Sequence, residues 1–350
     1  MSADDHGALL RDSIRSFLSR HGARSRVRAL RGTQPGYDRA HWNELAALGC
    51  IGALAPVAHG GVGLSLADMA AMLQELAPGL GPEPVVPVAV GAVGLLSLAP
   101  DSTLSQSLLP DIASGELIAA LAWQEEGYEL PGAYKTTLSI TGNQARLTGR
   151  KRFVVPACAD GYLVTASSAE GPVICWVPAG EAGVALRSEG RIDGTSSAEV
   201  EFKDVVVSPA HRASGPTVTT EAICDVADRC NVAVAAELLG VAESMLRMTL
   251  EYLKIREQFG RLIGSFQALQ HRAVDLYVQQ ELMRAALTAA LEVFSAHDST
   301  RRERSIAASR AKARAADGAL RIGREAVQMH GAMGFADEGD VGLHLKRALV

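Results

Sequence analysis

The stretch R-E-Q-F-G-R-L-I-G-S-F-Q, from Arg256 to Gln267, decides the fold of this chain, together with Q-M-H-G-A-M-G-F from Gln328 to Phe335. The first stretch follows a long helical pattern, in which apolar residues between 234 and 255 recur at alternating four- and three-residue intervals. The second stretch closes another helical pattern. Two such stretches, each at a helix end, are typical of the two sides of a binding site.

The glycines of the first stretch predict a break between two helices. We expect the long helix to end near Phe259 and Gly260, with Gly260 and Gly264 in left-handed conformations. A second apolar-periodic helix begins at about Phe266. Arg256 is therefore predicted to lie on the last turn of one helix, beside the start of the next.

The residue types in both stretches suit a nucleotide. The planar, permanently charged guanidinium of Arg256 can form paired hydrogen bonds with a diphosphate. Phe259 offers an apolar wall for an adenine or a ribose. In the second stretch Gly331 and Gly334 let backbone amides approach a ligand closely, and Gln328 can both donate and accept hydrogen bonds.

Each stretch also has a simpler interpretation. R-x-x-F-G alone is more often a helix end with a packed Phe, at roughly three to one, and glycine-rich turns are commonly plain turns. His330 is more often a packed or surface residue than a catalyst at such a position. The presence of both stretches in one chain favours the binding site.

Both stretches resemble signature segments of the acyl-CoA dehydrogenases, R-x-Q-F-G-x-P-I-x-x-F-Q and Q-x-x-G-G-x-G-[FY]. In that family these segments hold the ADP half of an FAD whose flavin ring lies in the neighbouring subunit. Two positions depart from the pattern, because Leu262 replaces a frequent Pro and Ala332 replaces the second Gly. The resemblance implies a cofactor-binding set of seven residues: Arg256, Gln258, Phe259, Gln267, Gln328, Gly331 and Ala332.

Composition indicates a globular protein and gives no sign of nucleic-acid binding. The 350 residues are 48% hydrophobic and carry a formal charge of -5, so no basic surplus indicates nucleic-acid binding. The five cysteines are scattered, without a C-x-x-C pair or a His at metal-ligand spacing, so we expect no metal site and a reducing cytoplasm. The acidic N-terminus does not resemble a signal peptide. The apolar segment 85–98 is interrupted by Pro87 and too short to cross a membrane, so we expect a buried helix.

The order of periodicities predicts an α+β fold of three domains. Helical patterns fill residues 1–115, short Val-, Ile- and Thr-rich runs fill 116–212, and helical patterns return in 213–350. These correspond to an N-terminal all-α domain, a central antiparallel β-barrel or sandwich, and a C-terminal four-helix bundle. The strands are expected near 134–140, 153–155, 162–164 and 173–177, and the last helices near 217–255, 266–294, 300–330 and 341–349.

The catalytic base of the family has no counterpart at either usual position, so we predict no catalytic residue in this chain. One position lies in an I-Y-E-G-T-like loop after the last helix, beyond Val350. The other lies ten residues before Gly240, where this chain has Cys230. Asp228 and Glu237 flank Cys230 along the helix, but helical geometry places neither carboxylate at the same point.

The β-domain has lost the side chains that contact the flavin ring in the family. Gln124 and Leu130 stand where the T-E-P-x-A-G-S-D-like segment has its Thr and Ser. Val155, at the position of the Thr in W-x-T, cannot form a hydrogen bond with the ring through its side chain. The residues for the ADP half of the FAD site are thus largely kept, and those for the flavin ring are largely replaced. This pattern is expected for a subunit that binds the nucleotide but not the flavin ring.

These observations predict a subunit of a hetero-oligomeric, FAD-dependent acyl-CoA dehydrogenase. It resembles the short subunit without the catalytic Glu in bacterial α2β2 enzymes that act on steroid side chains. The partners would be a second subunit carrying the Glu, an acyl-CoA, and an electron-transfer flavoprotein or similar acceptor. Two alternatives remain open. The first is a self-sufficient enzyme, either a homotetramer that uses Asp228 or Glu237 as base or a same-fold oxidase or monooxygenase. The second is a structural partner without any cofactor contact.

Overall fold

The computed structural model describes residues 3–20, 23–99, 101–127, 134–142, 144–214 and 220–350. Internal contacts divide the chain into two compact units. Unit 1 comprises Met1–Arg31, Leu66–Gly81 and Asn231–Val350, and unit 2 comprises Gly32–Ser65 and Pro82–Cys230. The division into domains at 1–115, 116–212 and 213–350 stays a prediction.

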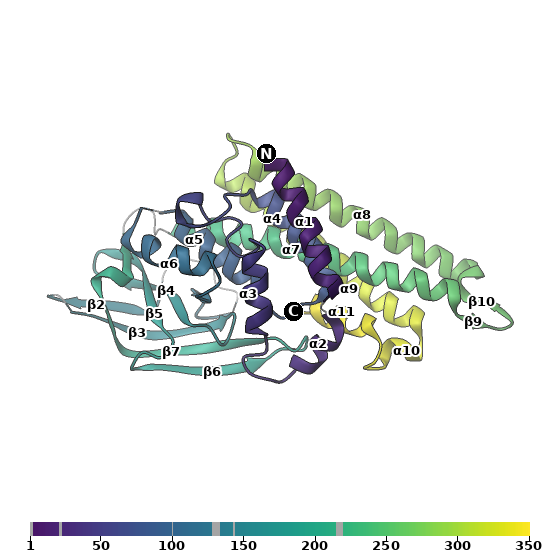
Figure 1. The fold of residues 1–350 in the computed structure, drawn as a ribbon, viewed down its shortest axis with the longest axis horizontal. Coiled ribbons are helices and arrows are strands. Elements are labelled where there is room, and N and C mark those ends of the chain that lie inside the picture. The colour runs from purple at the N-terminus through teal and green to yellow at the C-terminus, as the bar shows by residue number, and fades with distance from the viewer. Residues whose placement is uncertain (1–2, 21–22, 100, 128–133, 143, 215–219) are drawn as a thin grey trace. The chain divides into compact units, whose positions relative to one another are not determined.

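Unit 1 is helical, and its long helices lie side by side (Figure 1). The four C-terminal helices expected from the sequence are confirmed, each within a few residues of its predicted ends. Its helices are α1 (Ala3–Arg20), α2 (Ala23–Leu30), α4 (Leu66–Leu76), α7 (Thr220–Ile255, from Asn231 on), α8 (Gln267–Ser295), α9 (Arg301–His330), α10 (Ala332–Phe335) and α11 (Asp340–Ala348), with 3₁₀ turns η2 (Ala77–Gly79) and η6 (Ile263–Ser265).

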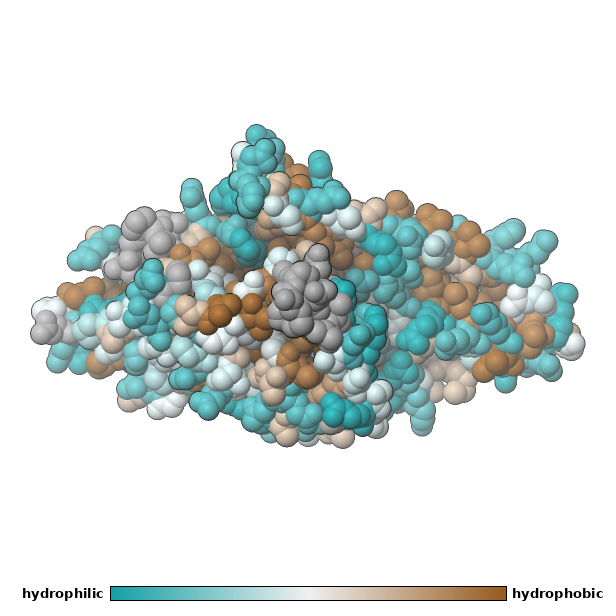
Figure 2. Space-filling view, turned by 45° about the horizontal axis from the view of Figure 1, so that its top comes forward, coloured by the Kyte–Doolittle hydropathy of each residue, from teal (hydrophilic) through white to brown (hydrophobic). Residues whose placement is uncertain are grey.

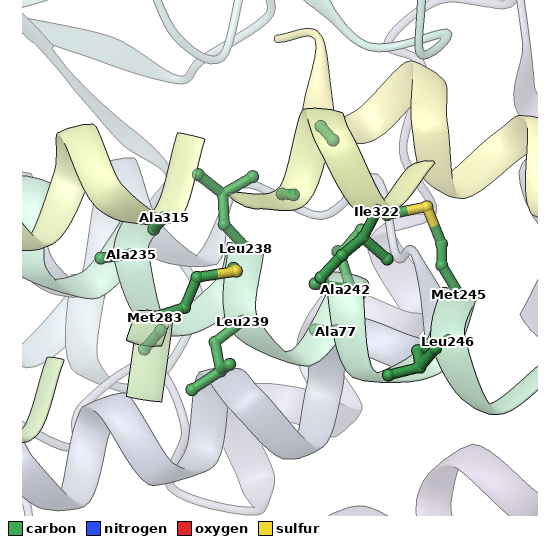
Figure 3. Close-up of a cluster of buried hydrophobic side chains, with 14 of the residues drawn as sticks. Ala77, Ala235, Leu238, Leu239, Ala242, Met245, Leu246, Met283, Ala315 and Ile322 are labelled. Carbon is green, nitrogen blue, oxygen red and sulfur yellow. The ribbon is translucent and has the colours of Figure 1, made fainter. Parts of the chain in front are cut away.

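Small residues let the helices of this bundle approach closely. A Cβ added to Gly318 of α9 would lie 2.4 Å from Sδ of Met283 on α8, so that crossing has no room for a larger residue. Met283 and Ile322 lie in the apolar cluster drawn in Figure 3, together with Leu238 and Leu239 of α7. Helix α9 begins with a capping box, in which Thr300 and Glu303 exchange side-chain to backbone hydrogen bonds.

Unit 2 combines short helices with a sheet. The segment predicted as a buried helix is confirmed as buried, and its first part is a π-helix, η3 (Val86–Ala92), followed by α5 (Val93–Ser97). In the described part of the chain, no helix is long and apolar enough to cross a membrane. The other helical elements are α3 (Arg39–Ala47), η1 (Val57–His59), α6 (Thr103–Ala113), η4 (Pro209–His211) and the first part of α7.

The sheet has eight strands, in the order β6-β7-β3-β2-β4-β5-β8, with β1 paired to β4. The antiparallel expectation holds for most pairs, but β1 and β2 both pair with β4 in parallel, so the sheet is mixed. The β2–β3 hairpin lies between β1 and β4 in the chain, which provides the long connection that a parallel pair needs. The strands are β1 (Ala119–Ala122), β2 (Thr137–Thr141), β3 (Gln144–Val154), β4 (Gly161–Ser168), β5 (Gly171–Pro178), β6 (Val184–Gly190), β7 (Ser196–Val207) and β8 (Arg212–Ser214).

Candidate functional site

The first signature stretch forms a β-hairpin that joins α7 to α8. Helix α7 ends at Ile255, so the expectation that it reaches Phe259 is wrong. Strands β9 (Glu257–Gln258) and β10 (Arg261–Leu262) pair antiparallel around a two-residue turn, Phe259–Gly260. Their φ angles of 55° and 75° are both positive, as in a type I′ hairpin turn, and this geometry reverses the chain instead of extending the helix.

The hairpin gathers three polar side chains on one face. Gln258 lies directly opposite Arg261, and the amide of Ile263 donates to the carbonyl of Arg256 over 2.9 Å. Because side chains alternate along a strand, Arg256 and Gln258 point to the same side, and cross-strand pairing adds Arg261 to it. Arg261 was missed from the sequence because it is recognisable only once the stretch is known to be a hairpin.

The cationic groups of the hairpin are available to a ligand. Arg256 is exposed, and within the described ranges its guanidinium has no hydrogen-bond or ion-pair partner. The guanidinium carbon of Arg261 lies 4.0 Å from the ring centroid of Phe266, a cation–π contact that holds this side chain in place. Gln258 donates from its side chain to the carbonyl of Glu257.

Phe259 is the least expected residue of the hairpin. Its side chain is 92% exposed, and its backbone has a left-handed conformation that a bulky residue rarely adopts. Its ring meets the ring of Phe266 edge-on, at 6.3 Å between centroids. Apart from this edge-on contact the ring lies in solvent on a strained backbone, a combination typical of a surface that another molecule covers.

Of the two glycines predicted to be left-handed, one has this conformation and the other has a different role. Gly260 is left-handed as expected, but Gly264 does not have a positive φ. A Cβ on Gly264 would lie 2.7 Å from the carbonyl oxygen of Leu253, so this glycine is needed for close packing against α7. Gln267 is the first residue of α8 and is exposed.

The second signature stretch ends α9. Gly331, with φ 59° and ψ −136°, turns the chain into α10, and Gln328, Gly331 and Ala332 are all exposed. Gly334 is buried instead, because a Cβ there would lie 2.4 Å from the carbonyl oxygen of Val327. The prediction that Gly334 lets a ligand approach is therefore wrong, since the missing side chain makes room for the backbone of Val327.

Two contacts bring the two stretches together at one end of unit 1. The ring of Tyr252, one turn before Arg256, stacks on His330 at 4.5 Å between centroids. Arg272 of α8 lies 3.5 Å from Glu325 of α9, three residues before Gln328. All seven predicted residues therefore belong to segments that meet at the end of the bundle that carries β9 and β10 (Figure 1). His330 is packed, as the simpler interpretation expected, and its Nδ1 lies 2.7 Å from the carbonyl oxygen of Ala326.

In unit 2, two buried charged groups near the expected flavin contacts pair with each other. Lys151 is fully buried, and its Nζ lies 2.7 Å from Glu125 and 3.1 Å from the hydroxyl of Thr165. The carboxylate of Glu125 also accepts from the amides of Lys135 and Thr136. Although burial opposes the shift, these donors keep the pKa of Glu125 below its usual value, so it stays ionised and engaged.

The positions that correspond to the flavin contacts lie next to this buried pair. The carbonyl of Gln124 accepts from the amide of Arg152 over 2.8 Å, and the side chain of Val155 is apolar. Leu130 lies outside the described residues. Burial raises the pKa of Cys230 to about 12, so the thiol at the alternative base position stays protonated at neutral pH.

The carboxylate of Glu237 is also occupied. One of its oxygens lies 2.9 Å from Arg347 of α11, whose guanidinium also donates to the carbonyls of Leu80 and Gly81. This ion pair within unit 1 therefore engages the carboxylate of Glu237. In the described part of the chain, no group of three or more His, Cys, Asp or Glu residues could hold a metal ion.

Comparison with known proteins identifies the family. The model for the acyl-CoA dehydrogenase N-terminal domain matches residues 4–116, and the model for the acyl-CoA dehydrogenase C-terminal domain matches residues 220–350. The chain belongs to the acyl-CoA dehydrogenase family. The α+β fold expected from the resemblance is confirmed.

Three relatives of this family member match over nearly its whole length. The acyl-CoA dehydrogenase IpdE2 of Mycobacterium tuberculosis is 29% identical, over 99% of this chain and 92% of its own. The Tcur3481-Tcur3483 steroid ACAD is 29% identical with a TM-score of 0.84, covering 99% of this chain and 92% of that one. The ChsE4-ChsE5 complex of M. tuberculosis is 28% identical with a TM-score of 0.83, covering 99% and 91%.

Acyl-CoA dehydrogenases depend on FAD, and the hairpin end suits the diphosphate of that cofactor. Arg256 and Arg261 supply two guanidinium groups, each able to form paired hydrogen bonds with phosphate oxygens. Phe259 and Phe266 supply apolar ring surface beside them. The exposed turn at Gly331 adds backbone that a ligand can approach, since a Cβ there would meet nothing within 4 Å.

Proposed function

We propose that this chain is the subunit without the catalytic base in a hetero-oligomeric acyl-CoA dehydrogenase. It contributes the ADP half of the FAD site, through Arg256, Gln258, Phe259, Gln267, Gln328, Gly331 and Ala332, to a partner that holds the flavin ring. The observation that carries the proposal is a contrast. The hairpin presents an unpaired guanidinium and an exposed aromatic ring, whereas Glu125 and Glu237 are engaged in ion pairs.

The reaction divides between the two subunits as follows. Bound FAD would supply the acceptor for the hydride on the β-carbon of the acyl-CoA, and a carboxylate of the partner would accept the α-proton. Arg256 and Arg261 of this chain bind the diphosphate and balance its charge. The electrons then leave to an electron-transfer flavoprotein or a similar acceptor.

An exposed apolar stripe on α8 supports assembly with another chain. Leu276, Met283 and Leu287 of α8 are buried in unit 1, yet Val274, Val278 and Leu282 are exposed at four-residue spacing on another face. Apolar side chains gather over this part of the surface in the right half of Figure 2. A helix that is apolar on two faces needs a second partner, and an α2β2 tetramer supplies one.

The relatives suggest the substrate class. One of the matched structures is a steroid ACAD, and another is a complex of two different chains. We propose that the enzyme introduces an α,β double bond into an acyl-CoA thioester with a steroid side chain as its acyl group.

Flavin occupancy and subunit composition test the proposal together. The chain expressed alone should hold FAD weakly, and co-expression with a family member that carries the catalytic Glu should give a mixed tetramer with bound FAD and turnover. Absorbance at the flavin band and light scattering measure these quantities. Full flavin occupancy with turnover in a homo-oligomer of this chain would contradict the proposal.

Two variants separate the alternatives. In a self-sufficient enzyme that uses Asp228 or Glu237 as base, the double variant Asp228→Asn/Glu237→Gln abolishes turnover, whereas the partner's base is unaffected in our proposal. If this chain is only a structural partner, Arg256→Ala leaves the FAD affinity of the complex unchanged.

A further inference from the structure

A polar cavity of about 350 Å³ lies between α1, α4 and α7 in unit 1, away from the nucleotide end. Arg11, Gln74, Glu75, Glu243, Ser244 and Arg247 contribute its polar lining. Ser244 lies twelve residues before Arg256 in the chain, most of them in α7, which at helical rise is roughly 18 Å along the axis. The cavity is therefore separate from the hairpin end.

Gly240 brings the two walls of the cavity together. A Cβ at Gly240 of α7 would lie 2.5 Å from the carbonyl oxygen of Gln74 and 2.7 Å from the Cβ of Ala77. The backbones of α7 and α4 are thus in direct contact at this point, and the cavity lies beside a rigid crossing. Its dimensions do not depend on long, mobile side chains at its base.

The two carboxylates of the lining are neutralised by neighbouring donors. Glu243 accepts from Nε2 of Gln74 at 3.0 and 3.1 Å and from Arg284 at 2.7 Å. Glu75 accepts from Nε of Arg15 at 3.0 Å and from a second nitrogen of the same guanidinium. Neither carboxylate therefore brings an uncompensated negative charge to the cavity.

Two groups of the lining lack such partners. The hydroxyl of Ser244 is buried, with 1% of the residue exposed, and among the residues that the structure describes its Oγ has no hydrogen-bond partner. Within residues 220–350 and the other described ranges, the guanidinium of Arg247 has no ion pair or hydrogen bond. Ser244 and Arg247 are three residues apart on α7, so their side chains are neighbours on one helix face. A buried hydroxyl without a partner costs free energy that a ligand can recover.

We infer that this cavity binds a compact oxyanion, the phosphate or carboxylate group of a small metabolite. Arg247 provides a charged pair of donors. The Oγ of Ser244 is enclosed by the protein, so the anion would draw this hydroxyl toward one of its oxygens by rotation about the Cα–Cβ bond. Arg11 adds a second positive charge to the lining. The carboxylates of Glu75 and Glu243, fixed by their own donors, border the cavity and limit the anion to a small one. The polar lining excludes an acyl chain, so the site is not a second position for the thioester substrate.

Calorimetric titration of the whole chain with inorganic phosphate and, separately, with succinate tests this inference. We expect at least one of the two probes to bind at millimolar concentration, and the probe that binds identifies the anion class. Arg247→Ala should weaken that binding by about tenfold or more, as for loss of a charged hydrogen bond. Arg302→Ala, which removes an exposed arginine of α9, is the matched control and should leave the affinity unchanged.

Ser244→Ala gives a second, independent readout. Because its Oγ has no partner in the chain, this variant should fold with an unchanged or slightly higher Tm, and the stabilisation that the anion gives to the parent chain should shrink. Failure of both probes to bind, or equal affinity in the parent chain and Arg247→Ala, would overturn the inference. The proposed role in FAD binding would survive either result, because Arg256 and Arg261 are unchanged in both variants.

Discussion

The hairpin end of unit 1 and the Glu125–Lys151 region of unit 2 differ in the burial and pairing of their charged groups. At the hairpin, Arg256 is exposed and unpaired, and Phe259 holds an aromatic ring in solvent. In unit 2, Lys151 is enclosed and every oxygen of Glu125 has a donor. Charged groups that serve the fold are satisfied within the chain, whereas those that serve a ligand are left open. This difference in pairing distinguishes a structural region in unit 2 from the proposed binding region in unit 1.

The largest expected effect is the loss of the buried ion pair. Lys151→Met should lower the free energy of unfolding by about 3–5 kcal/mol, because it leaves the carboxylate of Glu125 buried without its counter-charge. Guanidinium denaturation measures the loss. The double variant Glu125→Gln/Lys151→Met should recover part of it, since no unpaired charge is left buried and the amide oxygen of Gln still accepts from one of the two backbone donors.

Lys203→Met is the matched control for this variant. Lys203 also pairs with a glutamate, Glu201 at 3.2 Å, but its side chain is 70% exposed, so its removal should change the free energy of unfolding by less than about 1 kcal/mol. Equal effects of Lys151→Met and Lys203→Met would break the distinction between the buried and the exposed charges.

A buried histidine extends the comparison into unit 1. Burial lowers the pKa of His344 to about 4, while the carbonyl of Asp340 lies 2.9 Å from its Nδ1. The unfolded chain binds a proton near pH 6.5 and the folded chain does not, so stability falls as the pH drops from about 6.5 to about 4. The full loss is about 3 kcal/mol, and about 2 kcal/mol of it should be seen between pH 7 and pH 5.

Denaturation curves at pH 7 and pH 5 check this sign and size. His344→Gln should reduce the difference between the two curves, and His271→Gln, at an exposed position of α8, should leave it unchanged. A parent chain that is equally stable at both values of pH would contradict the assignment.

Loss of the unpaired guanidinium should act on the cofactor and not on the fold. Arg256→Ala should weaken FAD binding to the assembled enzyme by about 1.5–3 kcal/mol, the range for a charged hydrogen bond, with little change in Tm. Arg256→Lys should restore the charge without the paired geometry and give an intermediate affinity. Fluorescence titration of the apoenzyme with FAD measures all three proteins. An unchanged FAD affinity in Arg256→Ala would contradict a contact between Arg256 and the diphosphate.

Long-range features of the molecule could be predicted from the sequence. Helical periodicity located α7, α8, α9 and α11 to within a few residues, and the change to β-rich runs located the sheet. The signature stretches predicted which segments meet at one end of unit 1, because each contains residues suited to a nucleotide and lies at the end of a helix. The role of the seven residues in binding FAD stays a prediction.

Local backbone geometry could not be predicted in the same way. The turn at Phe259–Gly260 requires a bulky residue in a left-handed conformation, which propensity disfavours, so the helix was expected to continue and Arg261 was missed. Gly264 was expected to be left-handed and Gly334 to be open to a ligand, but both are packed against carbonyl oxygens that only the folded chain brings near. The parallel pairs of β4 likewise depend on partners distant in sequence.

The smallest expected effect tests the hairpin turn itself, and it should have opposite signs for stability and for binding. Phe259→Asn should stabilise the isolated chain by about 0.5–1 kcal/mol, because Asn adopts the left-handed region more readily and a residue that is 92% exposed loses only its edge-on contact with Phe266. The same variant should weaken FAD binding in the assembled enzyme, since the apolar wall beside Arg256 is gone. Phe335→Asn is the matched control, because Phe335 is 79% exposed but lies in α10 without a positive φ, so it should give no such gain. If Phe259→Asn lowered the Tm of the isolated chain, the ring would be stabilising the fold. The hairpin would then be a structural region, like the buried ion pair of Glu125 and Lys151.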